Sequence, residues 1–268
     1  MSCDAFSHPD QGNVASLSRE EMPVAGAAER EAIIFVHGSL GAGDAFAGQE
    51  ILSTYYDVRV ITRHGYTLAS QAMKVDHDKD VLDLIEAAGD GAHLVGTSTG
   101  ALIAAKAAAS CPEAIRSLTL IEPPAFAVAA DIPSVASAIE ALKLHWEKHG
   151  LSNREFMAGF LAALKMTRPV PKVIPPELDR AISLLRTEHL WAIDLPVGAL
   201  SDAGVPVLVV AGGWSPAYDA ICHRVASLTQ GQLTTITGFG HAVQKAGPAF
   251  NDVLEMHLRR ARRLRETL

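Results

Sequence analysis

Short runs of continuous apolar residues, many of them β-branched, recur along the chain. They cover residues 32–36, 58–61, 92–95, 118–121, 205–210 and 233–236. A strand that is apolar throughout is buried on both faces, which is typical of a mostly parallel sheet. Between these runs lie helical patterns, at about 73–88, 99–110, 217–229 and 246–266. The alternation predicts an α/β fold, in which helices flank a mostly parallel central sheet.

One long segment interrupts this alternation. Residues 124–200 contain several helical patterns separated by prolines, but no strand-like run. We expect a helical cap here, over the carboxyl edge of the sheet, where such sheets bind ligands. A separate helical domain is the alternative, although it would have little core of its own. The predicted organisation is a polar N-terminal lead-in at 1–30, a core formed by 31–123 and 201–268, and a cap at 124–200.

Composition and charge narrow the class of protein. Hydrophobic residues make up 49% of the 268 residues and charged residues 20%, which fits a globular protein with a sizeable core. The formal net charge of −7 argues against a nucleic-acid partner, because phosphate contacts need a basic surface. We expect a small-molecule substrate as the partner, and a monomer or homodimer as the assembly.

Cysteine usage and the apolar runs bear on localisation. The three cysteines are widely spaced and form no CxxC pair, which favours reduced thiols and argues against structural zinc. No uninterrupted apolar stretch reaches the roughly 18 residues that would cross a membrane. The first residues carry acidic side chains and no apolar run, so we expect no signal peptide. These observations predict a cytoplasmic protein without a membrane partner.

The most informative pattern is Gly96-Thr97-Ser98-Thr99-Gly100, a G-x-S-x-G sequence. It follows a predicted strand and precedes an alanine-rich helical pattern, which is the setting that a nucleophile elbow requires. On such a turn the hydroxyl of Ser98 would project above the sheet edge, and the helix N-terminus would offer free N–H groups to an oxyanion. The alternative is a glycine-rich turn with an incidental serine.

Three motifs together resemble the α/β-hydrolase superfamily, in its serine-dependent branch that carries a cap. They are His37-Gly38-Ser39, the G-x-S-x-G around Ser98, and Gly238-Phe239-Gly240-His241, in the order typical of that superfamily. The resemblance spans about 32–122 and 205–262 and leaves the cap unmatched. It implies an α/β-hydrolase fold and says almost nothing about the substrate.

The resemblance also implies roles for residues. Ser98 would be the nucleophile, and His241 would be the general base that takes its proton and later activates water. The oxyanion hole would consist of the backbone N–H groups of Thr99 and Ser39, with Leu40 as the alternative second donor. None of these roles needs a cofactor or a metal ion, and we expect neither.

The acid of the expected triad is not where the superfamily commonly places it. Ser215 occupies the position after the strand at 205–210 where an aspartate is usual. Glu122 follows the strand at 118–121 directly, and some members of the superfamily take their acid from that strand. Asp219 is the alternative acid, four residues beyond Ser215 and inside a predicted helix. We favour Glu122, because a carboxylate at a strand tip needs less adjustment to reach His241.

A serine nucleophile points to acyl transfer to water. We expect a serine hydrolase that cleaves an ester, lactone or thioester of a mid-sized, largely apolar molecule. Carbon–carbon bond hydrolysis of a β-diketone-like compound uses much the same residues, and a ligand-binding protein on this scaffold is an alternative from another class. The expected substrate-binding residues are His37, Phe126, Trp191 and Trp214.

Overall fold

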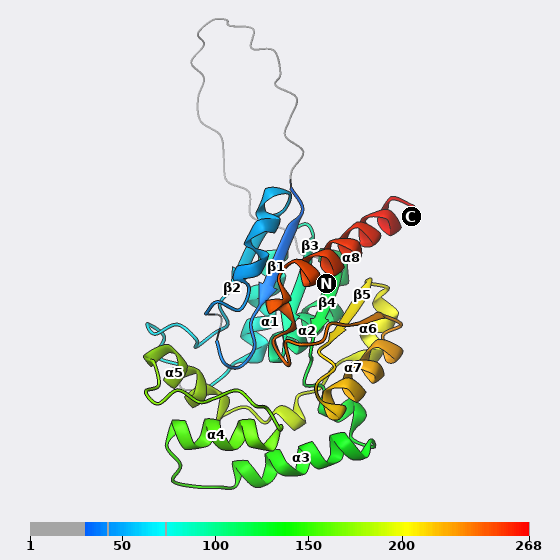
Figure 1. Cartoon of the computed structure of the whole chain (residues 1–268). Helices are drawn as coiled ribbons and strands as arrows, with labels where there is room; N and C mark the ends of the chain where they lie inside the picture. Colours follow the sequence, from blue (N-terminus) through cyan, green and yellow to red (C-terminus); the bar gives the residue numbers. More distant parts are fainter. Residues whose placement is uncertain (1–29, 42, 73, 268) are drawn as a thin grey trace, which may run out of the picture.

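Six parallel strands form one sheet in this computed structural model, which describes residues 30–41, 43–72 and 74–267 (Figure 1). The order across the sheet is β2-β1-β3-β4-β5-β6. All five strand pairs are parallel, so every strand ends at the same edge. The bounds are β1 Ala32–Val36, β2 Asp57–Ile61, β3 Ala92–Thr97, β4 Ile115–Ile121, β5 Val207–Ala211 and β6 Gln232–Thr235. The predicted fold class is confirmed, and each apolar run forms a strand. The expected lead-in lies outside the described residues except for Arg30.

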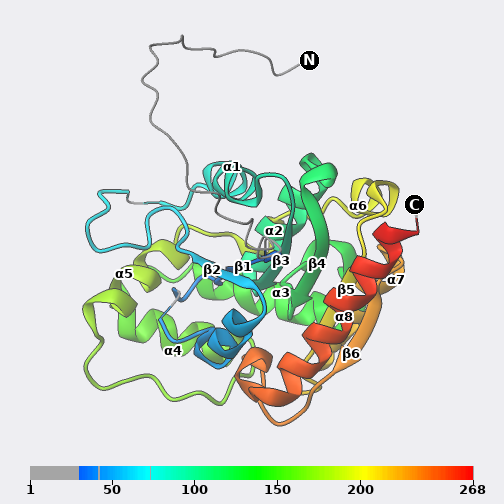
Figure 2. The ribbon, with the colours of Figure 1, turned by 90° about the horizontal axis from the view of Figure 1, so that it is seen from above.

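Helices cover both faces of this sheet (Figure 2). On one face, β1, β3, β4 and β5 pack against α1 (His77–Ala88), α2 (Thr99–Ser110) and α7 (Pro216–Leu228). On the other face they pack against α8 (Pro248–Glu266) and the 3₁₀ turns η1 (Ala47–Thr54) and η5 (Val243–Ala246). No helix in the described part of the chain combines the length and apolar character that crossing a membrane requires.

The segment between β4 and β5 is helical, and three of its helices lie together beyond the carboxyl ends of the strands (Figure 1). They are α3 (Pro133–Trp146), α4 (Asn153–Ala163) and α5 (Pro176–Leu185), between the 3₁₀ turns η3 (Phe126–Ala129) and η4 (Leu190–Ala192). The last helix, α6 (Val197–Ala203), packs against α2 and α7 of the core. The domain boundary expected at residue 200 therefore falls inside a helix that belongs to the core by its contacts.

Two glycines allow the turn between β3 and α2 to pack tightly. A Cβ atom on Gly96 would lie 2.4 Å from the carbonyl oxygen of Gly100, inside the start of α2. A Cβ atom on Gly100 would lie 2.4 Å from the carbonyl oxygen of Val36 and 2.5 Å from that of His37. Both contacts are with backbone, which cannot swing aside. The two glycines let α2 start directly against β1 and β3, and this fixes the position of Ser98 between them.

Three buried histidines are held in the neutral form. They are His37 after β1, His93 in β3 and His257 in α8. Burial lowers the pKa of each of them from 6.5 to about 4, because the charged ring loses its hydration. The His93 ring shares a hydrogen bond of 2.7 Å with the Ser117 hydroxyl on the neighbouring strand. His145 in α3 is a fourth buried histidine, and burial lowers its pKa too, so the described part of the protein carries several imidazoles that resist protonation.

We expect Gly100→Ala to lower the free energy of unfolding by about 1–3 kcal/mol, because its methyl group would overlap two backbone carbonyls. Gly198 is the matched control: it lies in α6, and a Cβ atom there meets nothing within 4 Å. Gly198→Ala should be neutral or should stabilise by up to ~1 kcal/mol. Urea denaturation measures both. Equal stability of the two variants would contradict the packing argument.

Stability should fall as the pH is lowered from 7 to 5. Below pH 6.5 His37, His93 and His257 bind protons in the unfolded chain, while in the folded protein they stay neutral until about pH 4. The unfolded state therefore binds more protons, at an upper limit of about 1.4 kcal/mol per pH unit for each histidine. Thermal unfolding followed by circular dichroism at a series of pH values measures the effect. A Tm that is constant or rises toward pH 5 would rule it out.

Candidate active site

Ser98 sits on a strained turn between β3 and α2. Its backbone has φ 53° and ψ −131°, a conformation that costs a residue with a side chain about 1–3 kcal/mol. Its N–H donates to the carbonyl of Ile121 at the tip of β4, over 2.8 Å. The side chain is only partly buried. This turn presents the hydroxyl at the carboxyl edge of the sheet, in the geometry of a nucleophile elbow.

Glu122 lies at the tip of the next strand and is fully buried. Its N–H donates to the carbonyl of Val210 in β5, and its φ of 48° turns the chain out of the sheet. The carboxylate accepts three hydrogen bonds: from the Gly212 N–H at 2.6 Å, from Trp214 Nε1 at 2.8 Å and from His241 Nδ1 at 3.1 Å. The structure therefore brings Glu122 and His241 together.

His241 comes from the loop that follows β6. A Cβ atom on Gly212 would lie 2.2 Å from the carbonyl oxygen of Gly240, so this loop packs directly on the chain after β5. Because the Glu122 carboxylate only accepts, the proton of the His241 ring is on Nδ1 and its Nε2 is free to accept. Among the described residues, neither this Nε2 nor the Ser98 hydroxyl has a hydrogen-bond partner. Such contacts commonly tighten only when substrate binds.

Asp219, the alternative acid, lies in the first turn of α7. Its carboxylate makes no hydrogen bond to His241 in the part of the chain that the structure describes. Burial and the nearby charge of Glu122 raise the pKa of Asp219, while a hydrogen bond from the Gly213 N–H opposes this. Ser215, where an aspartate is usual, instead caps α7 by accepting from the Tyr218 N–H. Among the described residues, the imidazole of His241 is therefore bonded to Glu122 and not to Asp219.

The loop after β1 lies against Ser98. A Cβ atom on Gly38 would be 2.8 Å from Ser98 Cβ and 3.3 Å from its Oγ, so only glycine permits this approach. The next residue, Ser39, shares a hydrogen bond of 2.6 Å with the side chain of Thr99. The two residues expected to supply oxyanion N–H groups are thereby joined through their hydroxyls, on either side of Ser98.

The ring of His37 makes hydrogen bonds to backbone groups on both of its nitrogens. The ring is fully buried, its Nδ1 donates to the Gly38 carbonyl at 2.8 Å, and its Nε2 accepts from the Arg63 N–H at 3.0 Å. Both nitrogens are satisfied by backbone groups. His37 therefore holds the loop after β1 against the chain after β2, and it has no free polar atom for a substrate.

The structure also reveals charged residues at this edge that the sequence analysis did not single out. Arg63 and Glu188 are fully buried and lie 2.9 Å apart, and Arg63 also pairs with Asp80 at 3.0 Å. Glu188 further accepts from the Ser39 hydroxyl and from His77. Arg63 could have been noticed because it follows a strand tip. Nothing in the local sequence around Glu188 indicates its buried position.

The remaining candidate substrate residues have different surroundings. Phe126 is fully buried and its ring packs edge-on against Tyr218, with centroids 5.9 Å apart. Trp214 is only partly buried, and its ring lies 6.1 Å from that of His241. Leu40 is partly buried and packs on the main core cluster. Of these residues, Trp214 lies beside the imidazole and also orients Glu122.

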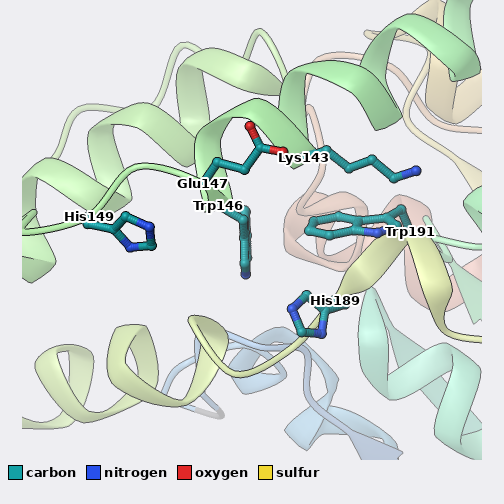
Figure 3. Close-up of a pocket in the computed structure, with 6 residues that line it drawn as sticks. All are labelled: Lys143, Trp146, Glu147, His149, His189 and Trp191. Atoms are coloured by element: carbon teal, nitrogen blue, oxygen red, sulfur yellow. The ribbon is translucent and has the colours of Figure 1, made fainter.

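Trp191 lines a cavity of about 440 Å³ on the inserted helical segment (Figure 3). Its indole packs edge-on against that of Trp146, with centroids 5.4 Å apart. The lining residues come from the end of α3, the residues just after it and the chain around η4: Lys143, Trp146, Glu147, His149, His189 and Trp191. None of the candidate catalytic residues is among them. Within the described ranges, no three His, Cys, Asp or Glu side chains gather as metal ligands would.

Comparison with solved structures finds the same fold in several hydrolases. A carboxylesterase of the thaumarchaeon Nitrososphaera gargenis is 16% identical, with a TM-score of 0.63 over 89% of this chain and 93% of that one. The thioesterase domain of the curacin biosynthetic pathway is 18% identical, with a TM-score of 0.56 over 86% and 93%. An N-acyl homoserine lactone degrading enzyme is 20% identical, with a TM-score of 0.58 over 85% and 93%.

No curated protein matches the chain significantly by sequence. A family model does match, and it covers residues 33–253, from β1 through the start of α8. This range includes the loop after β1, the elbow at Ser98, the tip of β4 and the loop that carries His241. Together with the six-stranded parallel sheet, the match shows that the chain belongs to the alpha/beta hydrolase family.

Proposed function

We propose that this protein is a serine hydrolase that cleaves an ester, lactone or thioester of a mid-sized, largely apolar molecule through an acyl-enzyme on Ser98. The observation that carries the proposal is the hydrogen bond of 3.1 Å between the buried Glu122 carboxylate and Nδ1 of His241. Ser98, on its strained elbow, lies at the same carboxyl edge of the sheet as Glu122, at the end of the adjacent strand. A carboxylate that orients an imidazole within reach of a serine hydroxyl is the arrangement that activates a serine nucleophile.

In the proposed reaction, Ser98 Oγ attacks the substrate carbonyl and His241 Nε2 takes its proton. The Glu122 carboxylate stabilises the imidazolium that forms, because it accepts from Nδ1. The backbone N–H groups of Ser39 and Thr99 donate to the oxyanion of the tetrahedral intermediate. The imidazolium then protonates the leaving group, and an acyl-enzyme remains.

The second half of the reaction returns the enzyme to its starting state. His241 deprotonates a water molecule, which attacks the acyl carbon from the position that the leaving group has vacated. A second tetrahedral oxyanion occupies the same site between Ser39 and Thr99. Collapse of this intermediate releases the carboxylic acid and returns the proton to Ser98. All of the proton transfers use one imidazole, and no cofactor takes part.

The proposed substrate class is supported by chemistry and by likeness of fold. Esters, lactones and thioesters share an electrophilic carbonyl and a good leaving group, which a serine nucleophile of this kind can attack. The structural relatives include a carboxylesterase, a thioesterase domain and a lactone degrading enzyme. The partly exposed indole of Trp214 lies beside His241, which favours an apolar group next to the scissile bond.

Ser98→Ala should abolish hydrolysis of p-nitrophenyl esters and lactones, by about 10³-fold or more in kcat, and should leave the fold intact. The reason is that no other group can form the acyl-enzyme. Ser227→Ala, at an exposed serine on α7, is the matched control and should retain full activity. Mass spectrometry after a fluorophosphonate probe should find the label on Ser98. Retained turnover in Ser98→Ala would refute the mechanism.

A wild-type protein that hydrolyses no ester or lactone and is not labelled at Ser98 would also count against the proposal. That result would favour the ligand-binding alternative. Labelling of Ser98 without ester turnover would favour hydrolysis of a carbon–carbon bond, which depends on the same activated serine.

Glu122→Gln should lower kcat by about 10³- to 10⁴-fold, because a neutral amide cannot stabilise the imidazolium and can turn its N–H group toward His241. Asp219→Asn is the matched control, since it also neutralises a carboxylate near the site, and it should change kcat by less than about threefold. Steady-state kinetics on one p-nitrophenyl ester measures both. A larger loss in Asp219→Asn would transfer the role of acid to Asp219.

A further inference from the structure

A carboxylate from the inserted segment reaches the loop that faces Ser98. Glu188 follows α5, and its Oε2 accepts a hydrogen bond from the hydroxyl of Ser39. The same hydroxyl oxygen lies 2.6 Å from the side-chain oxygen of Thr99. Glu188, Ser39 and Thr99 are all buried. One acidic group, 149 residues away from Ser39 in sequence, is thus linked to both residues whose N–H groups form the proposed oxyanion hole.

The other oxygen of this carboxylate is held equally firmly. Glu188 Oε1 accepts from Arg63 Nη2 at 2.9 Å and lies 3.3 Å from Nε2 of His77. Arg63 is fixed in turn by Asp80, whose carboxylate accepts from its Nε at 3.0 Å. With two donors on one side and Ser39 on the other, the carboxylate cannot rotate without breaking a hydrogen bond.

Ser39 is held through its backbone as well. The hydroxyl of Tyr66 donates to the Ser39 carbonyl at 3.1 Å. The Tyr66 ring packs edge-on against His37, with centroids 4.9 Å apart, and lies 5.0 Å from the Arg63 guanidinium carbon. Side chains on three separate segments therefore converge on a single residue of the loop after β1.

The negative charge of the Glu188 carboxylate lies next to the positive charge of Arg63. Burial alone would raise the pKa of this carboxyl, but the charge of Arg63 and the hydrogen bonds from His77 and Ser39 outweigh it and lower the pKa. A bare carboxylate this close to the proposed oxyanion hole would repel a developing negative charge. The Arg63 guanidinium, which Glu188 shares with Asp80, reduces that penalty and leaves Glu188 as a fixed acceptor.

We infer that Glu188 is a positioning residue for the reaction at Ser98: by accepting from the Ser39 hydroxyl, it aims the backbone N–H of Ser39 at the oxyanion. The inference rests on the proposed function, since it concerns the oxyanion of that reaction. It also makes the inserted segment part of the catalytic apparatus, because that segment supplies the group that holds Ser39 in place.

The test compares variants that remove the hydrogen bond between Ser39 and Glu188 by changing one partner or the other. Glu188→Gln keeps the shape but cannot accept from both Arg63 and Ser39, and Ser39→Ala removes the hydroxyl while keeping the backbone N–H. We expect each to lower kcat about tenfold, a fraction of the 10²- to 10³-fold cost of losing an oxyanion donor, with KM within about twofold. The double variant should be no slower than the slower single variant, because both changes remove the same tether.

Arg180→Ala is the matched control. Arg180 in α5 ties the same inserted segment to the core by donating to the carbonyls of Gly65 and Ala72, but it does not touch Ser39. We expect a lower Tm with kcat unchanged. If Glu188→Gln behaved in the same way, or if the losses in the double variant multiplied, the inference would be overturned. Should Glu188→Gln fail to fold, Ser39→Ala and its fluorophosphonate labelling rate still decide the question.

The proposed function and this inference fail in distinguishable ways. A wild-type protein with neither ester turnover nor labelling at Ser98 would overturn both of them. An active wild-type protein whose Glu188→Gln and Ser39→Ala variants are equally active would overturn only the positioning role of Glu188.

Discussion

The buried carboxylate of Glu122 ties the carboxyl edge of the sheet together. It sits at the tip of β4 and accepts from the chain after β5, from the Trp214 indole and from the loop after β6. A buried carboxylate without donors would cost several kcal/mol. The chain after β5, which carries Gly212 and Trp214, and the loop after β6 therefore both have to reach Glu122. The position of His241 at this edge is therefore set by an electrostatic requirement as well as by packing.

The turn at Ser98 obeys a second constraint, which is steric. Gly38, Gly96 and Gly100 bring the starts of a helix and a loop within contact of two strands, at distances that exclude any Cβ atom. The steric constraint at Ser98 applies to the end of β3, and the electrostatic constraint at Glu122 applies to the end of the adjacent strand, β4. Strain at Ser98 and Glu122, the two left-handed residues of the site, is sustained by these surroundings.

Much of this arrangement could be predicted from the sequence because it depends on local signals. Continuous apolar runs indicated the strands, and a parallel sheet brings their ends to one edge, so Ser98 and Glu122 could be placed there together. The role expected of His241 came from the resemblance to the α/β-hydrolase superfamily, carried by the glycine-rich loop after the last strand. Glu188 could not be found in this way. Its partner Arg63 is 125 residues distant, and no periodicity or spacing marks a lone acidic residue as buried.

The buried pair of Arg63 and Glu188 has a consequence for chimeric proteins in this family. The inserted segment leaves the core after β4 and rejoins it before β5, on adjacent strands, so it is a natural unit to exchange between relatives. A transplanted segment without a carboxylate at the position of Glu188 would leave Arg63 buried with Asp80 alone. Arg63 would keep one carboxylate partner but lose a buried hydrogen bond, which costs about 1–3 kcal/mol, a sizeable share of the stability of a domain. The core and the inserted segment therefore depend on each other. An exchanged segment would need a carboxylate at the position of Glu188, or the core would need a substitution of Arg63 as well.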